Sequence, residues 1–180
     1  SKLAADLKVH LLLGSFAEIH TLDSGEIDPQ RCYNTSVFFD DEGQILARYR
    51  KMHLFDVDVP NGPSLKESNS ICAGDQLVVV ETRLGKIGLS ICYDLRFPEL
   101  YRSLVDQGAE ILCVPSAFTL TTGKDHWHTL LRARAIETQS WVIAPGQWGK
   151  HDQEGKRNSY GHSLIINPWG TVVADAGLGE

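Results

Sequence analysis

The stretch LSICYDLRFPEL, residues 89–100, decides how this sequence is interpreted. An apolar run ends at Cys92, and an aspartate, an arginine and a proline follow within six residues. Free cysteine is among the most often buried residue types, so a thiol in the core is the simplest interpretation. The alternative is a reactive thiol at the end of a strand, and the rest of the chain has to decide between the two.

The chain alternates segments typical of strands with two segments typical of helices, which predicts an α/β fold with short hairpins inserted. A first helix is predicted between Arg96 and Gly108, since Pro98 suits an opening turn and glycine suits the end. A second is predicted over residues 126–139, with Asp125 as its N-cap. Segments bounded by Gly, Pro, Asn or Asp predict strands at residues 9–14, 34–39, 44–49, 77–81, 86–91, 110–115, 141–145, 163–167 and 171–175.

Length and composition indicate a soluble protein with a single domain over residues 1–180. The net charge of -6 and the pI near 5.6 give no basic surface, so we expect neither nucleic acid nor membrane as a partner. The four cysteines have no CxxC or zinc-type spacing, and we expect them to be reduced. We expect a cytoplasmic location, with a mitochondrial one left open. The Gly/Pro-containing segment VPNGPSLKES, residues 59–68, predicts a functional loop rather than a linker.

Cys92 lies where the strand predicted at residues 86–91 gives way to a turn and then a helix. Strand ends of this kind expose reactive groups in α/β folds, because a rigid strand and the N–H groups of the turn meet there. A thiol acts as a nucleophile only as the thiolate, which needs a cation, a helix N-terminus or a base nearby. Lys51, at the end of the strand predicted at residues 44–49, is a candidate for that cation.

Several motifs together resemble the nitrilase superfamily of carbon-nitrogen hydrolases, and the resemblance extends over nearly the whole chain. Within that superfamily the chain is most similar to the branch of deaminated-glutathione amidases and omega-amidases. The resemblance implies a four-layer α-β-β-α sandwich and assembly into a homodimer or larger oligomer. The motifs are YRKMHLFDVDVP, LKESN, LSICYDLRFPELYR, AEILCVPSAFTLTTGKDHW, LLRARAIETQ and YGHSLIINPWGTVVADAG.

The resemblance also implies the roles of individual residues. Cys92 would be the nucleophile, Lys51 the catalytic lysine, and Glu67 the second glutamate, which accepts a hydrogen bond from Lys51 or from the base. The backbone N–H of Tyr93 would stabilise the oxyanion together with Lys51. The thiolate would attack an amide carbonyl, ammonia would leave, and water would hydrolyse the thioester without a metal or organic cofactor. Candidate substrate contacts are Phe118, Thr119, Trp127 and Arg132.

The sequence departs from the family pattern at its ends. The family's base glutamate lies ahead of the segment LLLGSF, which here follows the first residue closely, and the family continues beyond ADAGLGE. We therefore expect an N-terminal strand and helix and a C-terminal tail to be missing, and the chain alone to hydrolyse amides slowly. Glu18 is an upstream acid, but it belongs to a later motif and is not assigned as the base.

Histidine and arginine side chains offer further candidates. His126 and His128 are two apart and would point to different faces of a helix, so no metal pair is expected. A dyad of Cys92 with His53 or His162 is disfavoured, since the lysine already accounts for activation. Arg96 and Glu99 could pair at a helix start, and a structural role is favoured for Arg132 and Arg134 over binding of a substrate carboxylate.

The sequence is consistent with three functions. The first is cleavage of an amide in a small carboxylate-bearing substrate, in its most specific form deaminated glutathione. The second is an omega-amidase that acts on 2-oxo acid amides. The third belongs to another class, a non-catalytic nitrilase-like interaction protein, against which the presence of both Cys92 and Lys51 argues.

Overall fold

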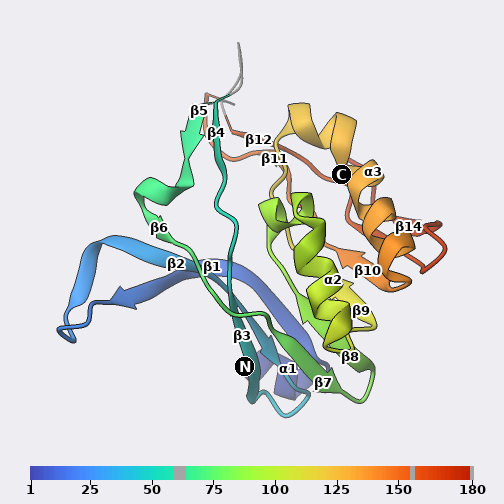
Figure 1. Cartoon of the computed structure of the whole chain (residues 1–180), viewed down its shortest axis with the longest axis horizontal. Helices are drawn as coiled ribbons and strands as arrows, with labels where there is room; N and C mark the ends of the chain where they lie inside the picture. Colours follow the sequence, from blue (N-terminus) through green and yellow to red (C-terminus); the bar gives the residue numbers. More distant parts are fainter. Residues whose placement is uncertain (59–63, 155–156, 179–180) are drawn as a thin grey trace. The chain divides into compact units, whose positions relative to one another are not determined.

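The computed structural model describes residues 1–58, 64–154 and 157–178 (Figure 1). The chain forms two compact units, Ser1–Val78 and Val79–Glu180. Of the functional loop predicted at residues 59–68, the part from 59 to 63 lies outside the described residues.

The first unit is built around a four-stranded sheet. Strands β1 (Leu11–Thr21) and β3 (Ile45–Arg50) pair antiparallel with the long strand β2 (Ile27–Phe39), and β6 (Ile71–Cys72) pairs parallel with β2. The turn between β2 and β3 is closed by the Asp40 carboxylate, which accepts hydrogen bonds from the following backbone. The remaining elements are helix α1 (Lys2–Leu7), the hairpin β4 (Asp56–Asp58) and β5 (Ser64–Lys66), and the 3-10 turn η1 (Glu67–Asn69).

The second unit contains a six-stranded sheet in the order β14-β13-β10-β9-β8-β7. Its three central strands, β8, β9 and β10, run parallel, and their short apolar sequences suit strands that are covered by helices. The strand bounds are β7 (Val79–Thr82), β8 (Gly85–Leu89), β9 (Ile111–Cys113), β10 (Trp141–Ala144), β13 (Leu164–Ile166) and β14 (Val172–Asp175).

Two helices pack on this second sheet and on each other, α2 (Pro98–Asp106) against β8 and α3 (Leu120–Thr138) against β10 and β13 (Figure 1). A 3-10 turn, η2 (Cys92–Arg96), joins β8 to α2. A small hairpin of β11 (Trp148–Lys150) and β12 (Asn158–Tyr160) contacts α3. The core consists of fully buried aliphatic side chains from strands and helices, among them Leu89, Leu104, Leu112, Leu131, Val142 and Ile166.

All nine strand segments expected from the sequence contain a strand, in two main sheets, and the predicted α/β class is confirmed. The layering as a sandwich stays a prediction. The predicted start of the second helix was wrong. Its N-cap is Thr119, whose hydroxyl accepts from the Thr122 N–H, so Asp125 lies inside the helix. The predicted Arg96–Glu99 contact is replaced by one between the Arg96 guanidinium and His126 Nδ1, 3.2 Å apart.

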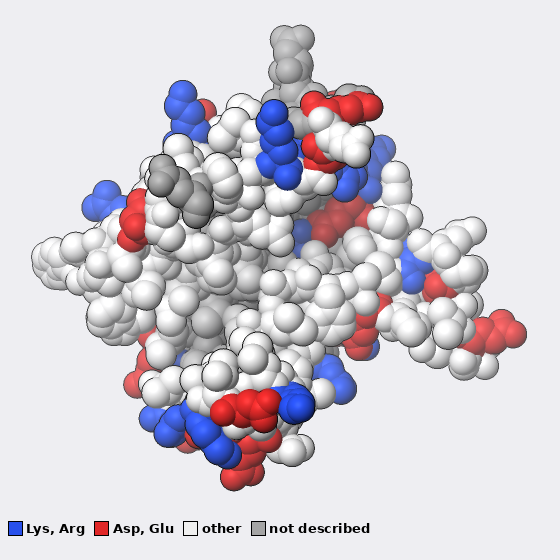
Figure 2. Space-filling view, turned by 180° about the vertical axis from the view of Figure 1, so that it is seen from behind, with Lys and Arg blue, Asp and Glu red and all other residues white. Residues whose placement is uncertain are grey.

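The described residues include no helix that is both long enough and apolar enough to span a bilayer. On the face drawn in Figure 2, basic and acidic side chains are intermingled, and neither positive nor negative side chains form a continuous patch there.

Candidate active site

Cys92 is the first residue of the turn η2, directly beyond the C-terminal end of the parallel strand β8. Its φ of +51° is left-handed, a conformation that costs a non-glycine residue about 1 to 3 kcal/mol and that is concentrated at functional sites. Its N–H donates to the Pro115 carbonyl at 3.0 Å, which extends the pairing of β8 with β9 by one more contact. The half-buried thiol therefore lies on a strained turn at a rigid strand end, as reactive residues of α/β enzymes do.

Two buried side chains stabilise this turn, Asp94 within the turn itself and Arg134 on α3. The Asp94 carboxylate is fully buried and accepts from the Ile91 N–H at 2.8 Å. The Arg134 guanidinium, on α3, donates twice to the Leu95 carbonyl, from Nε at 3.1 Å and Nη2 at 2.8 Å. Arg134 also pairs with Glu137 at 2.7 Å. The structural role favoured for Arg134 is thus confirmed, because its donors are directed at the turn that carries Cys92.

The three other cysteines differ from Cys92 in their surroundings. Cys113 ends strand β9 and is buried, and burial raises the pKa of its thiol to about 12. Its thiolate is therefore negligible at neutral pH. Cys32 and Cys72 lie on adjacent, paired strands of the first unit, where the Cys32 thiol is 3.7 Å from the Ser70 carbonyl.

Lys51 and Glu67 form a tight ion pair in the first unit. Lys51 follows β3, its side chain is 3% exposed, and its Nζ lies 2.5 Å from Glu67 Oε2. The same carboxylate oxygen accepts the Phe55 N–H at 2.6 Å, and Oε1 accepts from the Asn34 amide at 3.2 Å. The Lys51 backbone is fixed as well, because its N–H donates to the Asn34 carbonyl at 2.8 Å. The expected Lys51–Glu67 hydrogen bond is therefore present.

The burial of Lys51 carries information about function. Lysine is almost never fully buried unless it is paired, and a buried pair is weak evidence for stability because desolvation offsets the attraction. Three donors hold the Glu67 carboxylate in one orientation, so the ammonium group is held in one place too. This arrangement suits a cation that has to stabilise a developing negative charge.

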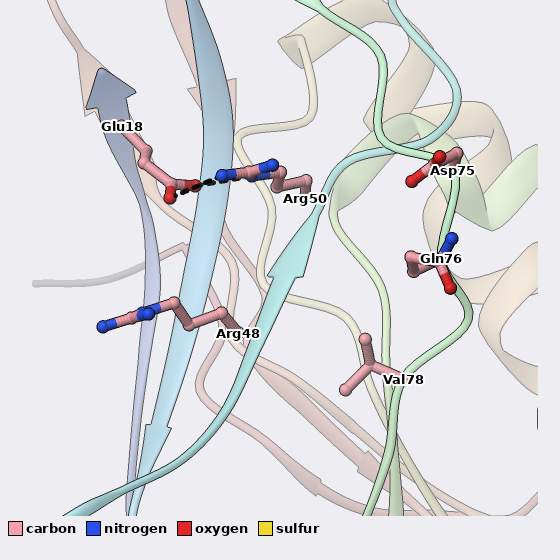
Figure 3. A pocket seen from close by; sticks show the side chains of 6 residues that line it. All are labelled: Glu18, Arg48, Arg50, Asp75, Gln76 and Val78. Carbon is pink, nitrogen blue, oxygen red and sulfur yellow. Dashed lines mark hydrogen bonds and ion pairs between the residues drawn. The ribbon is translucent and has the colours of Figure 1, made fainter. Parts of the chain in front are cut away.

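Glu18 lies in a separate pocket of the first unit, lined by Glu18, Arg48, Arg50, Asp75, Gln76 and Val78 (Figure 3). Its carboxylate forms two bonds of 2.9 Å with the Arg50 guanidinium, and it accepts from the Thr35 hydroxyl at 2.6 Å. These contacts, that with Arg50 first, lower the pKa of Glu18 below its ordinary value. A carboxylate held in this way is a poor proton acceptor, so Glu18 is a poor candidate for the base.

The candidate substrate contacts lie on or next to α3, and most of them also have structural partners. Thr119 caps the helix. Trp127 is 1% exposed, packs on Phe118 with ring centroids 4.8 Å apart and donates from Nε1 to the His162 carbonyl at 2.7 Å. Arg132 donates from Nε to the Gly170 carbonyl at 2.8 Å. Trp127 and Phe118 are therefore both buried in this structure, and all four residues stay predictions as substrate contacts.

The carbon-nitrogen hydrolase family matches residues 1–180, the whole chain. The chain belongs to this family. A deaminated glutathione amidase of Dictyostelium discoideum is 52% identical over 96% of this chain and 58% of its own length. Among solved structures, the NitFhit protein of C. elegans is 46% identical with a TM-score of 0.87, over 98% of this chain and 42% of that one.

A mutant amidase from Nesterenkonia sp. AN1 also matches this carbon-nitrogen hydrolase chain, with 26% identity and a TM-score of 0.79 over 98% of this chain and 60% of that one. In that structure the acetamide moiety of fluoroacetamide is attached covalently to the active-site cysteine. The chain thus spans about 40 to 60% of the length of these relatives. The resemblance seen in the sequence motifs is confirmed at the level of the family.

Proposed function

We propose that this protein is an amidase that hydrolyses a small carboxylate-bearing amide through a thioester on Cys92. The observation that carries the proposal is the Lys51–Glu67 pair, because such an ion pair is weak evidence for stability and a lysine that is only 3% exposed therefore points to a functional role. The second support is the left-handed turn at Cys92 beyond a parallel strand. An amidase whose sequence is 52% identical to this chain agrees with this activity.

In the proposed reaction, the Cys92 thiolate attacks the amide carbonyl and a tetrahedral oxyanion forms. Lys51 and the backbone N–H of Tyr93 stabilise that oxyanion, and Glu67 keeps the ammonium in position. The C–N bond then breaks, the amine leaves with a proton, and water hydrolyses the thioester to free the acid and the thiol. The proton transfers need a general acid-base carboxylate, which the family resemblance implies ahead of β1. The scheme uses no metal or organic cofactor.

We infer deaminated glutathione as the substrate from the relative at 52% identity that carries that name. A substrate of this kind bears carboxylates, for which exposed Arg132 is a candidate partner, and Phe118 and Thr119 are candidate contacts for its chain. Assembly into a homodimer or larger and a cytoplasmic location stay predictions.

Steady-state hydrolysis by the protein of deaminated glutathione and of a 2-oxo acid amide tests the substrate. We expect a higher kcat/KM for deaminated glutathione. A higher value for the 2-oxo acid amide would make the protein an omega-amidase. Failure on both substrates, with no loss of fold by circular dichroism, would favour the non-catalytic interaction protein.

A further inference from the structure

Three side chains of the second unit, none of them used in the proposed reaction, converge on one point. His128 comes from α3, His162 from the loop between β12 and β13, and Asp175 from the end of β14. The ligand atoms that they offer, an imidazole nitrogen from each histidine and a carboxylate oxygen, all lie within 4.8 Å of one another. Among the described residues this is the group of three histidine, cysteine or acidic side chains that is close enough for a metal ion.

The separations are close to those of ligands around a metal. His162 Nδ1 lies 2.9 Å from Asp175 Oδ1, and His128 Nε2 lies 3.3 Å from Asp175 Oδ2. Ligands about 2.0 to 2.2 Å from a tetrahedral ion are roughly 3.4 Å apart. The pair of His128 Nε2 and Asp175 Oδ2 has this spacing, and His162 Nδ1 lies slightly closer to the same oxygen, at 3.1 Å. The two imidazole rings have centroids 4.9 Å apart, and a tetrahedral set requires their ligating nitrogens to lie about 3.4 Å apart.

The surrounding structure holds the three groups in place. The Asp175 carboxylate accepts from the Gly177 N–H at 2.8 Å. The His162 backbone is fixed on both sides, because its N–H donates to the Gly177 carbonyl at 2.7 Å and its carbonyl accepts from Trp127 Nε1 at the same distance. His162 is in the left-handed region, at φ +54°, which directs its side chain at a cost in strain. The Tyr160 ring stacks on its imidazole with centroids 4.6 Å apart.

The charge of the cluster suits a cation. Asp175 offers a carboxylate oxygen, and each histidine offers an imidazole nitrogen that binds a metal once it is deprotonated. Neutral histidine is the commonest metal ligand in proteins. Two imidazoles with one carboxylate favour zinc, cobalt or nickel over magnesium or calcium, which prefer oxygen ligands.

We propose that His128, His162 and Asp175 bind one divalent ion of the zinc class. The sequence predicts no metal site, because His126 and His128, two residues apart on a helix, point to different faces. Those two do point to different partners, since His126 contacts Arg96 while His128 contacts Asp175. The ion would link α3, the β12–β13 loop and β14, and its stabilisation of the second unit would rise with the logarithm of its concentration above Kd.

Isothermal titration calorimetry of the protein with Zn²⁺ and with Co²⁺, each added alone to chelator-treated protein, tests the site. We expect one ion per chain, a Co²⁺ absorption spectrum that indicates nitrogen and oxygen ligands, and a rise in Tm with Zn²⁺ that a chelator reverses. Asp175→Asn and His128→Ala should each weaken binding by at least about 10-fold. The matched control is His126→Ala, on the same helix but outside the cluster, which should bind as the wild type does.

Two further measurements keep the test decisive. Near-ultraviolet circular dichroism shows whether each variant keeps its packing. If His128→Ala fails to fold, Asp175→Asn still tests the site, because the asparagine keeps an oxygen that accepts from the Gly177 N–H. Cys92→Ser should bind the ion unchanged, because the proposed ligands include no thiol. The proposal is overturned if the wild type binds no ion, if Cys92→Ser abolishes binding, or if folded Asp175→Asn binds as tightly as the wild type.

Discussion

At the scale of single residues, the four thiols should differ sharply in reactivity. Cys92 is half-buried on a strained turn, whereas burial raises the pKa of Cys113 to about 12 and leaves it protonated. Brief treatment with iodoacetamide followed by peptide mass spectrometry should show Cys92 labelled ahead of Cys32, Cys72 and Cys113. Equal labelling of the four thiols, or a lead for Cys113, would contradict this ranking.

Lys51 is the second residue on which the proposed reaction depends. Lys51→Met removes the ammonium that is held by Glu67, and loss of one donor to an oxyanion typically costs about 100- to 1,000-fold in kcat. We expect a fall of that size in steady-state hydrolysis by the protein. Lys66→Met, an exposed lysine on β5, is the matched control and should leave kcat within about 2-fold. Equal losses in the two variants would remove Lys51 from the mechanism.

These residues differ in how far the sequence alone predicts them. The position of Cys92 at a strand end followed from the apolar run before it, while Glu67 came only from the family resemblance. The His128–His162–Asp175 cluster was missed because Asp175 is 47 residues from His128 and 13 from His162. Only the packing of α3, a loop and a strand brings them together, and no local pattern signals it.

At the scale of elements, Arg134 ties α3 to the turn η2 through the Leu95 carbonyl. Arg134→Met should lower the free energy of unfolding by about 1.5 to 3 kcal/mol, the usual range for hydrogen bonds to a charged group. Urea denaturation measures this change. Glu137→Gln, which keeps both bonds to Leu95, should cost less than about 1 kcal/mol. A larger loss in Glu137→Gln than in Arg134→Met would contradict the assignment.

The contact between β1 and β3 through Glu18 and Arg50 should depend on pH. Because the folded-state pKa of Glu18 is lowered, its contribution is present above the unfolded value of 4.5 and is lost as pH falls through the folded value. Glu18→Gln should therefore be less stable than the wild type at pH 7, by less than about 1 kcal/mol for a partly exposed pair. Denaturant titrations at pH 7 and below pH 4 should show this difference shrink in acid. A difference that grows in acid would contradict the sign.

Strands were easier to predict than helix ends. Each predicted strand had apolar residues bounded by turn formers, but β4, β5, β11 and β12 have three residues each and no such pattern. The start of α3 was missed because LTTG is a poor helix-forming sequence. Tertiary contact overrides that propensity, since the Tyr160 side chain packs where a side chain at Gly123 would be.

At the scale of the whole molecule, the family match covers all 180 residues, while the proposed catalytic residues are divided between the two compact units. Lys51 and Glu67 belong to the first unit and Cys92 to the second. A protein that only kept the fold for interaction would not need a buried lysine in one unit and a strained cysteine in the other. These residues therefore support the proposed amidase over a non-catalytic interaction protein.

The acyl-enzyme is the most direct test of this function. The protein is mixed with deaminated glutathione, quenched in acid at short times, and analysed by intact-mass and peptide mass spectrometry. We expect the acyl part of the substrate, without its leaving amine, on Cys92 of the wild type, and neither adduct nor hydrolysis with Cys92→Ala. An adduct on another residue, or undiminished hydrolysis by Cys92→Ala, would contradict the proposed function.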